Sequence, residues 1–315
     1  MTLANILITG STGQIGGELV SLFGEGLGQI HASTRDELDL SDAASIRSAI
    51  RFLRPRWIIN PAAYTAVDKA ESEPELAHAI NAEAPRILGE EARRIGAAII
   101  HFSTDYVFDG AKSDPYLESD PTNPLGVYGA SKLAGEQALA ATGAAHIVLR
   151  TSWVYGATGK NFLRTILKLA AERPELKIVD DQHGAPTWSH DLARLAAHIV
   201  AHCETESTAR QVTLNSVISP HASVYHATSQ GETTWHGFAS EALRQSNIPN
   251  PATLIPIPTS AYPTPARRPA NSRLNCEKLY RTFGFRLPPW QQSLTTVLSH
   301  LTPAAPIQII PPLSL

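Results

Sequence analysis

Cysteine and methionine are scarce in this sequence of 315 residues, which contains two cysteines, Cys203 and Cys276, and one methionine. There is no C-x-x-C pair and no histidine cluster at ligand spacing, so we predict neither a disulfide framework nor a metal site. Isolated cysteines are typical of a reducing compartment, and we therefore expect a cytoplasmic protein.

A surplus of positive charge is also lacking. Lys and Arg number 26 against 29 Asp and Glu, which gives a formal net charge of −3 at pH 7. Such a chain has no basic field to hold a phosphate backbone, so no nucleic acid partner is expected. A small anionic ligand remains compatible with this charge.

Long apolar runs are absent as well. No segment approaches the ~20 consecutive apolar residues that cross a bilayer, so no membrane association is predicted. The apolar start, residues 1–9, is short and has no basic flank, which favours a first strand over a signal peptide. With 43% hydrophobic and 17% charged residues, we expect a soluble globular protein.

In the first half of the sequence, short apolar runs alternate with longer segments of helical period. This alternation predicts an α/β fold, a Rossmann doubly wound parallel sheet. The expected strands lie near residues 6–9, 30–33, 57–60, 98–103 and 145–150. The expected helices lie near residues 13–23, 43–53, 74–95, 128 onward and 162–171.

The composition changes after about residue 172, where proline and threonine become more frequent and strands become short. We predict an NAD(P)-binding domain over 1–172 and a smaller C-terminal substrate-binding lobe over 173–302, with some segments returning to the sheet. The proline-rich stretch 249–269 is expected to be a docked loop. Residues 303–315 are expected to be a frayed tail or a strap for a partner.

A glycine-rich turn follows the first predicted strand and precedes a helix. Gly10 permits a tight turn, Gly13 lets the backbone approach a pyrophosphate, and Gly16 lets the helix and strand pack closely. The helix N-terminus then faces the phosphates. The alternative is a glycine turn of structural use only, but its place between strand and helix favours dinucleotide binding.

The second predicted strand ends without the acidic residue that would hold a ribose 2′-hydroxyl. Arg35, with Ser33 and Thr34, stands there instead and would accept a 2′-phosphate, which favours NADPH with NADH tolerated. A solvated surface charge is the other interpretation of Arg35.

Tyr128 and Lys132 are spaced one turn apart on the same face of a predicted helix. A phenol needs a nearby cation to exchange protons at neutral pH, and such a tyrosine can protonate a carbonyl oxygen while hydride reaches its carbon. The spacing also arises by chance in pairs without chemistry. Thr104, with Ser103 at the end of the preceding strand, is a candidate hydrogen-bond donor to the same oxygen, or a turn-forming threonine.

Motifs along nearly the whole chain resemble the dTDP-4-dehydrorhamnose reductase family, whose members are extended short-chain dehydrogenases. The motifs are TGSTGQIGGEL (9–19), NPAAYTAVDKAE (60–71), STDYVFDG (103–110), YGASKLAGE (128–136), RTSWVYG (150–156), DQHGAPT (181–187), GETTWHGFA (231–239), RRPANSRL (267–274) and LPPW (287–290).

The resemblance implies reduction of the 4-keto group of dTDP-4-dehydrorhamnose to dTDP-L-rhamnose, a precursor of cell-surface polysaccharide, with NADPH or NADH. It implies the catalytic residues Tyr128, Lys132 and Thr104. By position, it implies pyrophosphate contacts by Gly13, Gln14 and Ile15, adenosine contacts by Asp39 and Leu40, and contacts below the nicotinamide by Ala62, Ala63, Tyr64 and Thr65. It implies substrate contacts by Thr104, Asp105 and Trp153; the alternative for Trp153 is a side chain that only fills the core. Arg268 would either meet the diphosphate or form an ion pair at the surface.

The sequence departs from the family at a few positions. Some members hold Mg²⁺ at a dimer interface through three glutamates, where this chain has Glu18, His190 and Gln292. We predict no such metal; a homodimer remains open. Tyr64 replaces a usual histidine, and 215–221 look like extra residues, neither of which touches the predicted chemistry.

Two other functions share these motifs. A sugar-nucleotide epimerase or dehydratase would use bound NAD, but dehydratases carry a second acid after the aspartate, where this chain has Tyr106. The second alternative is a non-catalytic regulatory subunit that keeps the NADP site. Turnover separates it from an enzyme.

Overall fold

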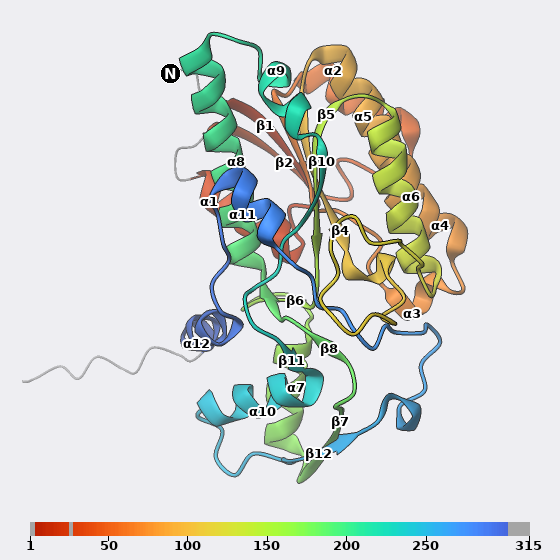
Figure 1. Ribbon diagram of the computed structural model, residues 1–315, viewed down its shortest axis with the longest axis vertical. Coiled ribbons are helices and arrows are strands. Elements are labelled where there is room, and N and C mark those ends of the chain that lie inside the picture. Colours follow the sequence, from red (N-terminus) through yellow and green to blue (C-terminus); the bar gives the residue numbers. More distant parts are fainter. Residues whose placement is uncertain (1–3, 25–27, 302–315) are drawn as a thin grey trace, which may run out of the picture.

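A six-stranded parallel sheet forms the centre of the fold, with the strands in the order β10-β5-β4-β3-β1-β2 (Figure 1). The computed structural model describes residues 4–24 and 28–301. The strands of this sheet are β1 (Ala4–Thr9), β2 (Gly28–Ser33), β3 (Trp57–Asn60), β4 (Ala98–Thr104), β5 (Ala145–Thr151) and β10 (Ser223–His226). Every residue of β3, β4 and β5 is buried, because helices cover both faces of the sheet. The predicted α/β Rossmann fold is confirmed.

The order of the strands places a switch point between β1 and β3. From β1 the chain moves outward to β2 and then crosses back to β3 on the other side of β1. Connections on the two sides of this point leave in opposite directions, so a crevice opens at the carboxyl ends of β1 and β3. Doubly wound sheets bind their ligands in this crevice.

Helices pack on both faces of the sheet (Figure 1). One face carries α1 (Gln14–Gly24) and α8 (Ser189–Arg210), and the other carries α2 (Ala43–Leu53), α5 (Ala84–Ile95) and α6 (Val127–Ala141). The helix expected over 74–95 is α4 (Pro74–His78), a π-helical turn (Ala79–Glu83) and α5 in succession. α3 (Val67–Ala70) precedes it.

A second group of elements lies beyond the carboxyl edge of the sheet, at the bottom of Figure 1. Its elements are β6 (Val154–Tyr155), α7 (Phe162–Glu172), β7 (Glu175–Val179), β8 (His183–Gly184), β9 (Thr187–Trp188), β11 (Thr233–Thr234), α10 (Trp235–Gln245), β12 (Thr253–Ile257) and α12 (Trp290–Leu301). α7, β7 and α10 share one apolar core, which includes Ile166, Leu176 and Leu243. The stretch 249–269 is docked there through β12, which pairs in parallel with β7.

The chain passes between the two groups more than once. α7 lies within the range predicted for the first domain, yet it packs with β7 and α10. Its helical period says which face is apolar but not which neighbour covers that face. α8, α9 (Leu214–Ile218), β10 and α11 (Glu277–Phe283) return to the sheet. The tail predicted over 303–315 lies outside the described residues.

Within the described part of the chain, three short 3-10 turns complete the elements: Asp105–Val107, Ser219–His221 and Thr259–Ala261. Among the described residues, no helix is both long and apolar enough to cross a bilayer.

Candidate active site

The glycine turn connects β1 to α1 at the switch point. Gly10 has a φ of 56°, a left-handed conformation that favours glycine. A Cβ on Gly16 would lie 2.1 Å from the carbonyl oxygen of Gly10, so a side chain there would push α1 off the strand. A Cβ on Gly13 would meet only that same oxygen, at 3.2 Å, so this face of the backbone is otherwise open. The turn therefore leaves room for a group that approaches the N-terminus of α1.

Gln14, the first residue of α1, joins the turn to the second group of elements. Its Oε1 accepts a hydrogen bond of 3.0 Å from Nδ2 of Asn161, and Asn161 caps α7 by accepting from the backbone N–H of Arg164. Ile15 packs against the apolar core. The side chains of Gln14 and Ile15 thus hold the turn, and their backbone remains the part that would contact a pyrophosphate.

The end of β2 carries the exposed Arg35. The charges of Asp39 and Lys69 both lie close enough to Arg35 to interact with it. Hydrogen bonds from Ser41 lower the pKa of Asp39. Leu40 is buried in the core. Arg35 and Lys69 thus bring two cations near one another, and Nζ of Lys69 also pairs with Oε1 of Glu73 at 2.6 Å. Lys69 was not identified from the sequence because it comes from a different segment.

The loop after β3 borders the glycine turn. A Cβ on Gly10 would lie 2.8 Å from Cβ of Ala62, so the two segments touch. Ala63 is half-buried, Thr65 is exposed, and the Tyr64 hydroxyl donates to Oε2 of Glu73 at 2.6 Å. Of these residues, Ala62 is the one whose contact with the glycine turn is direct.

Asn81 holds this loop in place. Its Oδ1 accepts from the backbone N–H of Tyr64 at 2.8 Å, and its Nδ2 donates to the carbonyl of Tyr64 and to Oγ of Ser131 on α6. Asn81 is buried within the π-helical turn, and its carbonyl oxygen would lie 2.0 Å from a Cβ on Gly135. Sequence reasoning missed Asn81 because a π-helical turn has no periodic signal in an otherwise regular helix.

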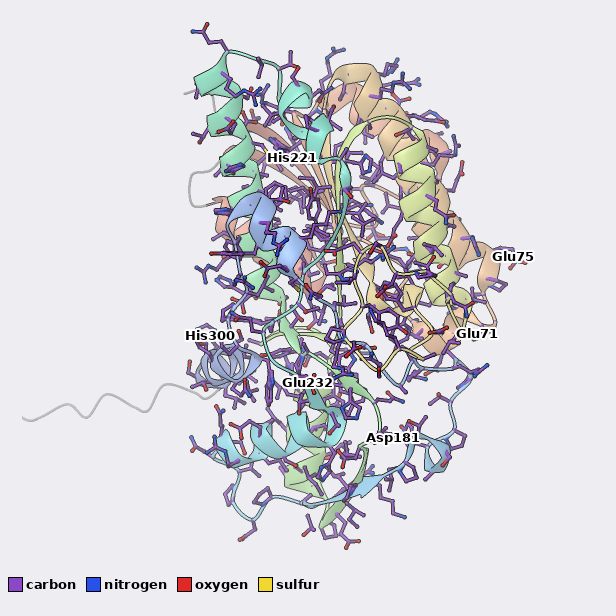
Figure 2. All side chains as sticks on the ribbon, viewed as in Figure 1. Glu71, Glu75, Asp181, His221, Glu232 and His300 are labelled. Carbon is purple, nitrogen blue, oxygen red and sulfur yellow. The ribbon has the colours of Figure 1, made fainter. Side chains whose placement is uncertain are left out.

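Tyr128 lies in the first turn of α6. Oε1 of Glu71, a residue labelled in Figure 2, accepts from the backbone N–H of Val127 at 2.9 Å and so anchors the start of the helix. Burial raises the pKa of Tyr128 to about 12, although the hydroxyl of Thr104 acts in the opposite direction. The phenol therefore keeps its proton at neutral pH and can donate it. Thr104, at the end of β4, is 5% exposed.

Lys132 lies one turn further along α6 and is 2% exposed. Its Nζ donates to the carbonyl oxygen of Phe102 at 2.6 Å and lies 3.3 Å from Nε2 of His101. Burial lowers the pKa of Lys132 to about 8, against the opposing charge of Glu136. The ammonium is thus held close to the carboxyl end of β4, the strand that ends at Thr104.

Asp105 and Trp153 lie at the ends of β4 and β5. Burial raises the pKa of Asp105 to about 6, although the hydroxyls of Ser272 and Thr104 act in the opposite direction. Its Oδ1 accepts from the Thr104 hydroxyl at 3.1 Å. Trp153 has a φ of 50°, which is strained for a non-glycine residue. Its ring stacks on Trp235 with centroids 3.7 Å apart, and a Cβ on Gly184 would lie 2.6 Å from it. Packing against α10 therefore sets the orientation of Trp153.

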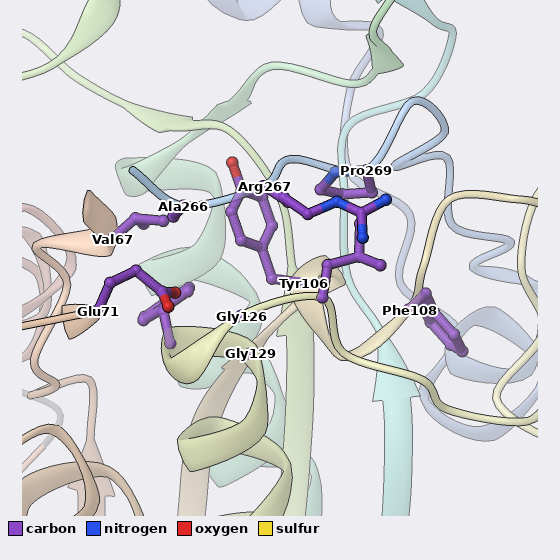
Figure 3. Close-up of a pocket in the computed structure, with 11 residues that line it drawn as sticks. Val67, Glu71, Tyr106, Phe108, Gly126, Gly129, Ala266, Arg267 and Pro269 are labelled. Atoms are coloured by element: carbon purple, nitrogen blue, oxygen red, sulfur yellow. The ribbon is translucent and has the colours of Figure 1, made fainter. Parts of the chain in front are cut away.

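Arg268 forms an ion pair within the protein. Its Nη2 lies 2.8 Å from Oδ2 of Asp68 and its Nη1 lies 3.0 Å from Oδ1, a bidentate ion pair with α3. The segment that carries it passes over Tyr106, and a narrow pocket lies between this segment and the start of α6 (Figure 3). Ala266, Arg267 and Tyr128 contribute to its lining.

Glu18 and His190, two of the three positions considered above for Mg²⁺, bond to each other. Nδ1 of His190 lies 2.9 Å from Oε2 of Glu18, so the two side chains satisfy one another. Within 4–24 and 28–301, no group of three or more His, Cys, Asp or Glu side chains is arranged to hold a metal ion.

The parallel sheet with its switch point, the glycine turn and the Tyr128 and Lys132 helix define a Rossmann-fold protein of the short-chain dehydrogenase class. A family model described as the RmlD substrate binding domain matches residues 4–302. The dTDP-4-dehydrorhamnose reductase of Burkholderia thailandensis is 48% identical over 295 residues, which cover 92% of this chain and 96% of that protein. The chain belongs to the dTDP-4-dehydrorhamnose reductase family.

Solved structures agree with this assignment. The dTDP-4-dehydrorhamnose reductase of Bacillus anthracis str. Ames, in complex with NADP, has a TM-score of 0.85 and 30% identity, with 95% of this chain and 100% of that chain covered. A UDP-glucose 4-epimerase of Thermus thermophilus, in complex with NAD, has a TM-score of 0.73 at 20% identity, with 95% and 99% covered. The second likeness extends only to the fold.

Proposed function

We propose that this chain reduces the keto group of dTDP-4-dehydrorhamnose with NADPH and produces dTDP-L-rhamnose. The observation that carries the proposal is the protonated Tyr128 beside Thr104, at the carboxyl edge of the sheet. The relatives named for this reaction match the chain over nearly its whole length.

The chain's own residues supply binding and a proton. The open backbone of Gly13 and the N-terminus of α1 fit a pyrophosphate, and Arg35 with Lys69 fits the 2′-phosphate of NADPH. Bound NADPH supplies the hydride that reaches the carbonyl carbon. Tyr128 donates its proton to the carbonyl oxygen while Thr104 holds that oxygen, and the nearby Lys132 ammonium stabilises the resulting phenolate.

The sugar nucleotide would occupy the space between the sheet edge and the second group of elements. The carboxyl of Asp105, at the end of β4, would accept a hydrogen bond from a sugar hydroxyl, and the strained Trp153 offers an aromatic wall. Arg268 would leave Asp68 and bind the diphosphate, to which a guanidinium is well matched. On this proposal the substrate-binding lobe is mainly 173–302, joined by α7, and 1–172 otherwise holds the cofactor.

Turnover with a panel of substrates tests the proposal. NADPH oxidation should be fastest with the dTDP-linked 4-ketohexose and slower with GDP- and CDP-linked analogues. Redox-neutral turnover with tightly bound NAD would indicate an epimerase or dehydratase instead. Cofactor binding without turnover of any substrate would indicate the regulatory subunit. A homodimer and a cytoplasmic location are separate predictions, tested by light scattering and cell fractionation.

A further inference from the structure

Four buried polar side chains form a hydrogen-bonded chain that crosses the sheet and ends at Lys132. Thr9 Oγ1 donates to Oδ1 of Asn60 at 2.6 Å, Nδ2 of Asn60 lies 3.0 Å from Nδ1 of His101, and Nε2 of His101 lies 3.3 Å from Nζ of Lys132. None of the four side chains is more than 2% exposed. They come from β1, β3, β4 and α6, so only the assembled sheet brings them together.

Burial makes this chain costly unless every member is paired. Asn60 and His101 are register partners in adjacent strands, which places their side chains next to each other. The proposed reaction assigns a role to Lys132 but none to Thr9, Asn60 or His101. Three apolar side chains would fill the same space without the cost of desolvating polar groups. We therefore look for the role of Thr9, Asn60 and His101 in their contact with Lys132.

His101 stays neutral in this position. Burial, then the charge of Lys132 and then that of His146, hold the pKa of His101 well below its usual range. A neutral imidazole has one donor and one acceptor nitrogen. When Lys132 is an ammonium it presents only donors, so Nε2 must accept and Nδ1 carries the hydrogen. The amide of Asn60, turned over, then accepts from Nδ1 and donates to the Thr9 hydroxyl.

The Asn60 amide, as the structure places it, has the opposite polarity. When Lys132 is a neutral amine, Nε2 carries the hydrogen and donates to Nζ, Nδ2 of Asn60 donates to Nδ1, and Thr9 donates to Oδ1 of Asn60. Asn60 and Thr9 each have both donor and acceptor capacity, so the direction of the hydrogen bonds along the chain can reverse. Two acceptor-only or donor-only residues in their places would not allow this reversal.

We propose that His101 is a positioning residue, which fixes Nζ of Lys132 at the end of β4 and keeps it hydrogen-bonded in both of its charge states. This inference rests on the proposed function. Two other charged groups act on this pair of side chains: Glu136, on the same helix as Lys132, is paired with Arg150 on β5, and His146 on β5, the register partner of Ile99, acts on His101 through its charge.

Two substitutions of His101 separate its two ring nitrogens. The amide of glutamine reaches about as far as Nε2 and keeps an acceptor for Lys132, whereas the shorter amide of asparagine reaches about as far as Nδ1 and keeps only the contact with Asn60. We expect H101N to lower kcat about 10- to 100-fold, as misplacement of a catalytic group does, with an unchanged KM. H101Q should retain most of the activity.

The pH profile gives a second readout. In H101N the ammonium has lost an acceptor, so the alkaline limb of kcat should move to lower pH, while H101Q should keep the wild-type limb. The proposal would be overturned if H101N had the wild-type kcat and the wild-type alkaline limb. It would also be overturned if H101N and H101Q lost kcat to the same extent. Thr9→Val, which removes only the hydroxyl at the far end, should give a smaller loss of kcat, and wild-type behaviour there would also count against the chain.

The proposal and the proposed function can fail separately. If the wild-type protein does not reduce the dTDP-linked ketohexose, the proposed function fails. The pKa of Lys132, measured by NMR on protein with labelled lysine, should still be lower in H101N than in wild type, and equal values would overturn the positioning role. Thermal unfolding shows whether each variant is folded. If H101N does not fold, kcat, its pH profile and the pKa of Lys132 are measured in H101Q and Thr9→Val instead.

Discussion

Replacing Tyr128 by phenylalanine removes the proposed proton donor and keeps the ring. The ring packs edge-on to Tyr106 with centroids 5.7 Å apart, a contact that phenylalanine preserves, so the fold and NADPH affinity should be retained. General acids typically contribute 10²- to 10⁴-fold to the rate. The loss of kcat therefore corresponds to about 3–5 kcal/mol of activation free energy.

The assay is NADPH oxidation with the dTDP-linked 4-ketohexose under steady-state conditions, together with NADPH binding measured by fluorescence. Tyr280→Phe is a matched control, because Tyr280 lies on α11, away from the crevice, and is 41% exposed. It should leave kcat unchanged. Wild-type kcat in the Tyr128→Phe variant would refute the assignment of the proton donor, and loss of NADPH binding would show that the substitution acts on the cofactor site instead.

Lys132, Asp68 and Gly16 each allow a further test of the site. Because burial lowers the pKa of Lys132 to about 8, the ammonium loses its proton as the pH rises through this value, so kcat should fall there; a profile flat far above it would contradict the role of the charge. Asp68→Asn frees Arg268 from an ion pair of about 0.5–1 kcal/mol, which should lower the KM for the sugar nucleotide about two- to fivefold; an unchanged or higher KM would mean that Arg268 does not exchange partners. Gly16→Ala places a methyl carbon 2.1 Å from a backbone oxygen of the turn, so its Tm and NADPH affinity should drop, whereas Gly17→Ala, with its nearest atom at 3.6 Å, should not lower either.

Several features of the fold were predictable because they are local. The helix 43–53 and the strand 57–60 have the predicted ends. The interruption at Ala79–Glu83 was not predicted, because a π-helical turn depends on how Asn81 meets Ser131 and Gly135 across the helix interface. The place of α7 was also not predicted, because an amphipathic pattern does not identify the surface that covers it.

In the candidate site, too, local features were predictable from the sequence and contacts between distant segments were not. Spacing within one segment predicted the glycine turn and placed Tyr128 and Lys132 on one face of a helix. The structure joins Arg268, predicted to meet a diphosphate, to Asp68, a residue 200 positions away in sequence. His101 lies within the strand predicted over 98–103, but its contact with Lys132 depends on the approach of α6 to β4.

The sequence by itself determined the alternation of strands and helices, the tight turn at Gly10 and the one-turn spacing of the catalytic pair. These depend on backbone sterics and on periodicity within a few neighbouring residues. Only the tertiary structure decided that Thr9, Asn60 and His101 form a hydrogen-bonded chain that ends at Lys132. It also decided that Asn81 holds the loop after β3. Hydrogen bonds reach only about 3 Å, so such partnerships exist only once distant segments have been brought to that separation by the packing of the sheet and its helices.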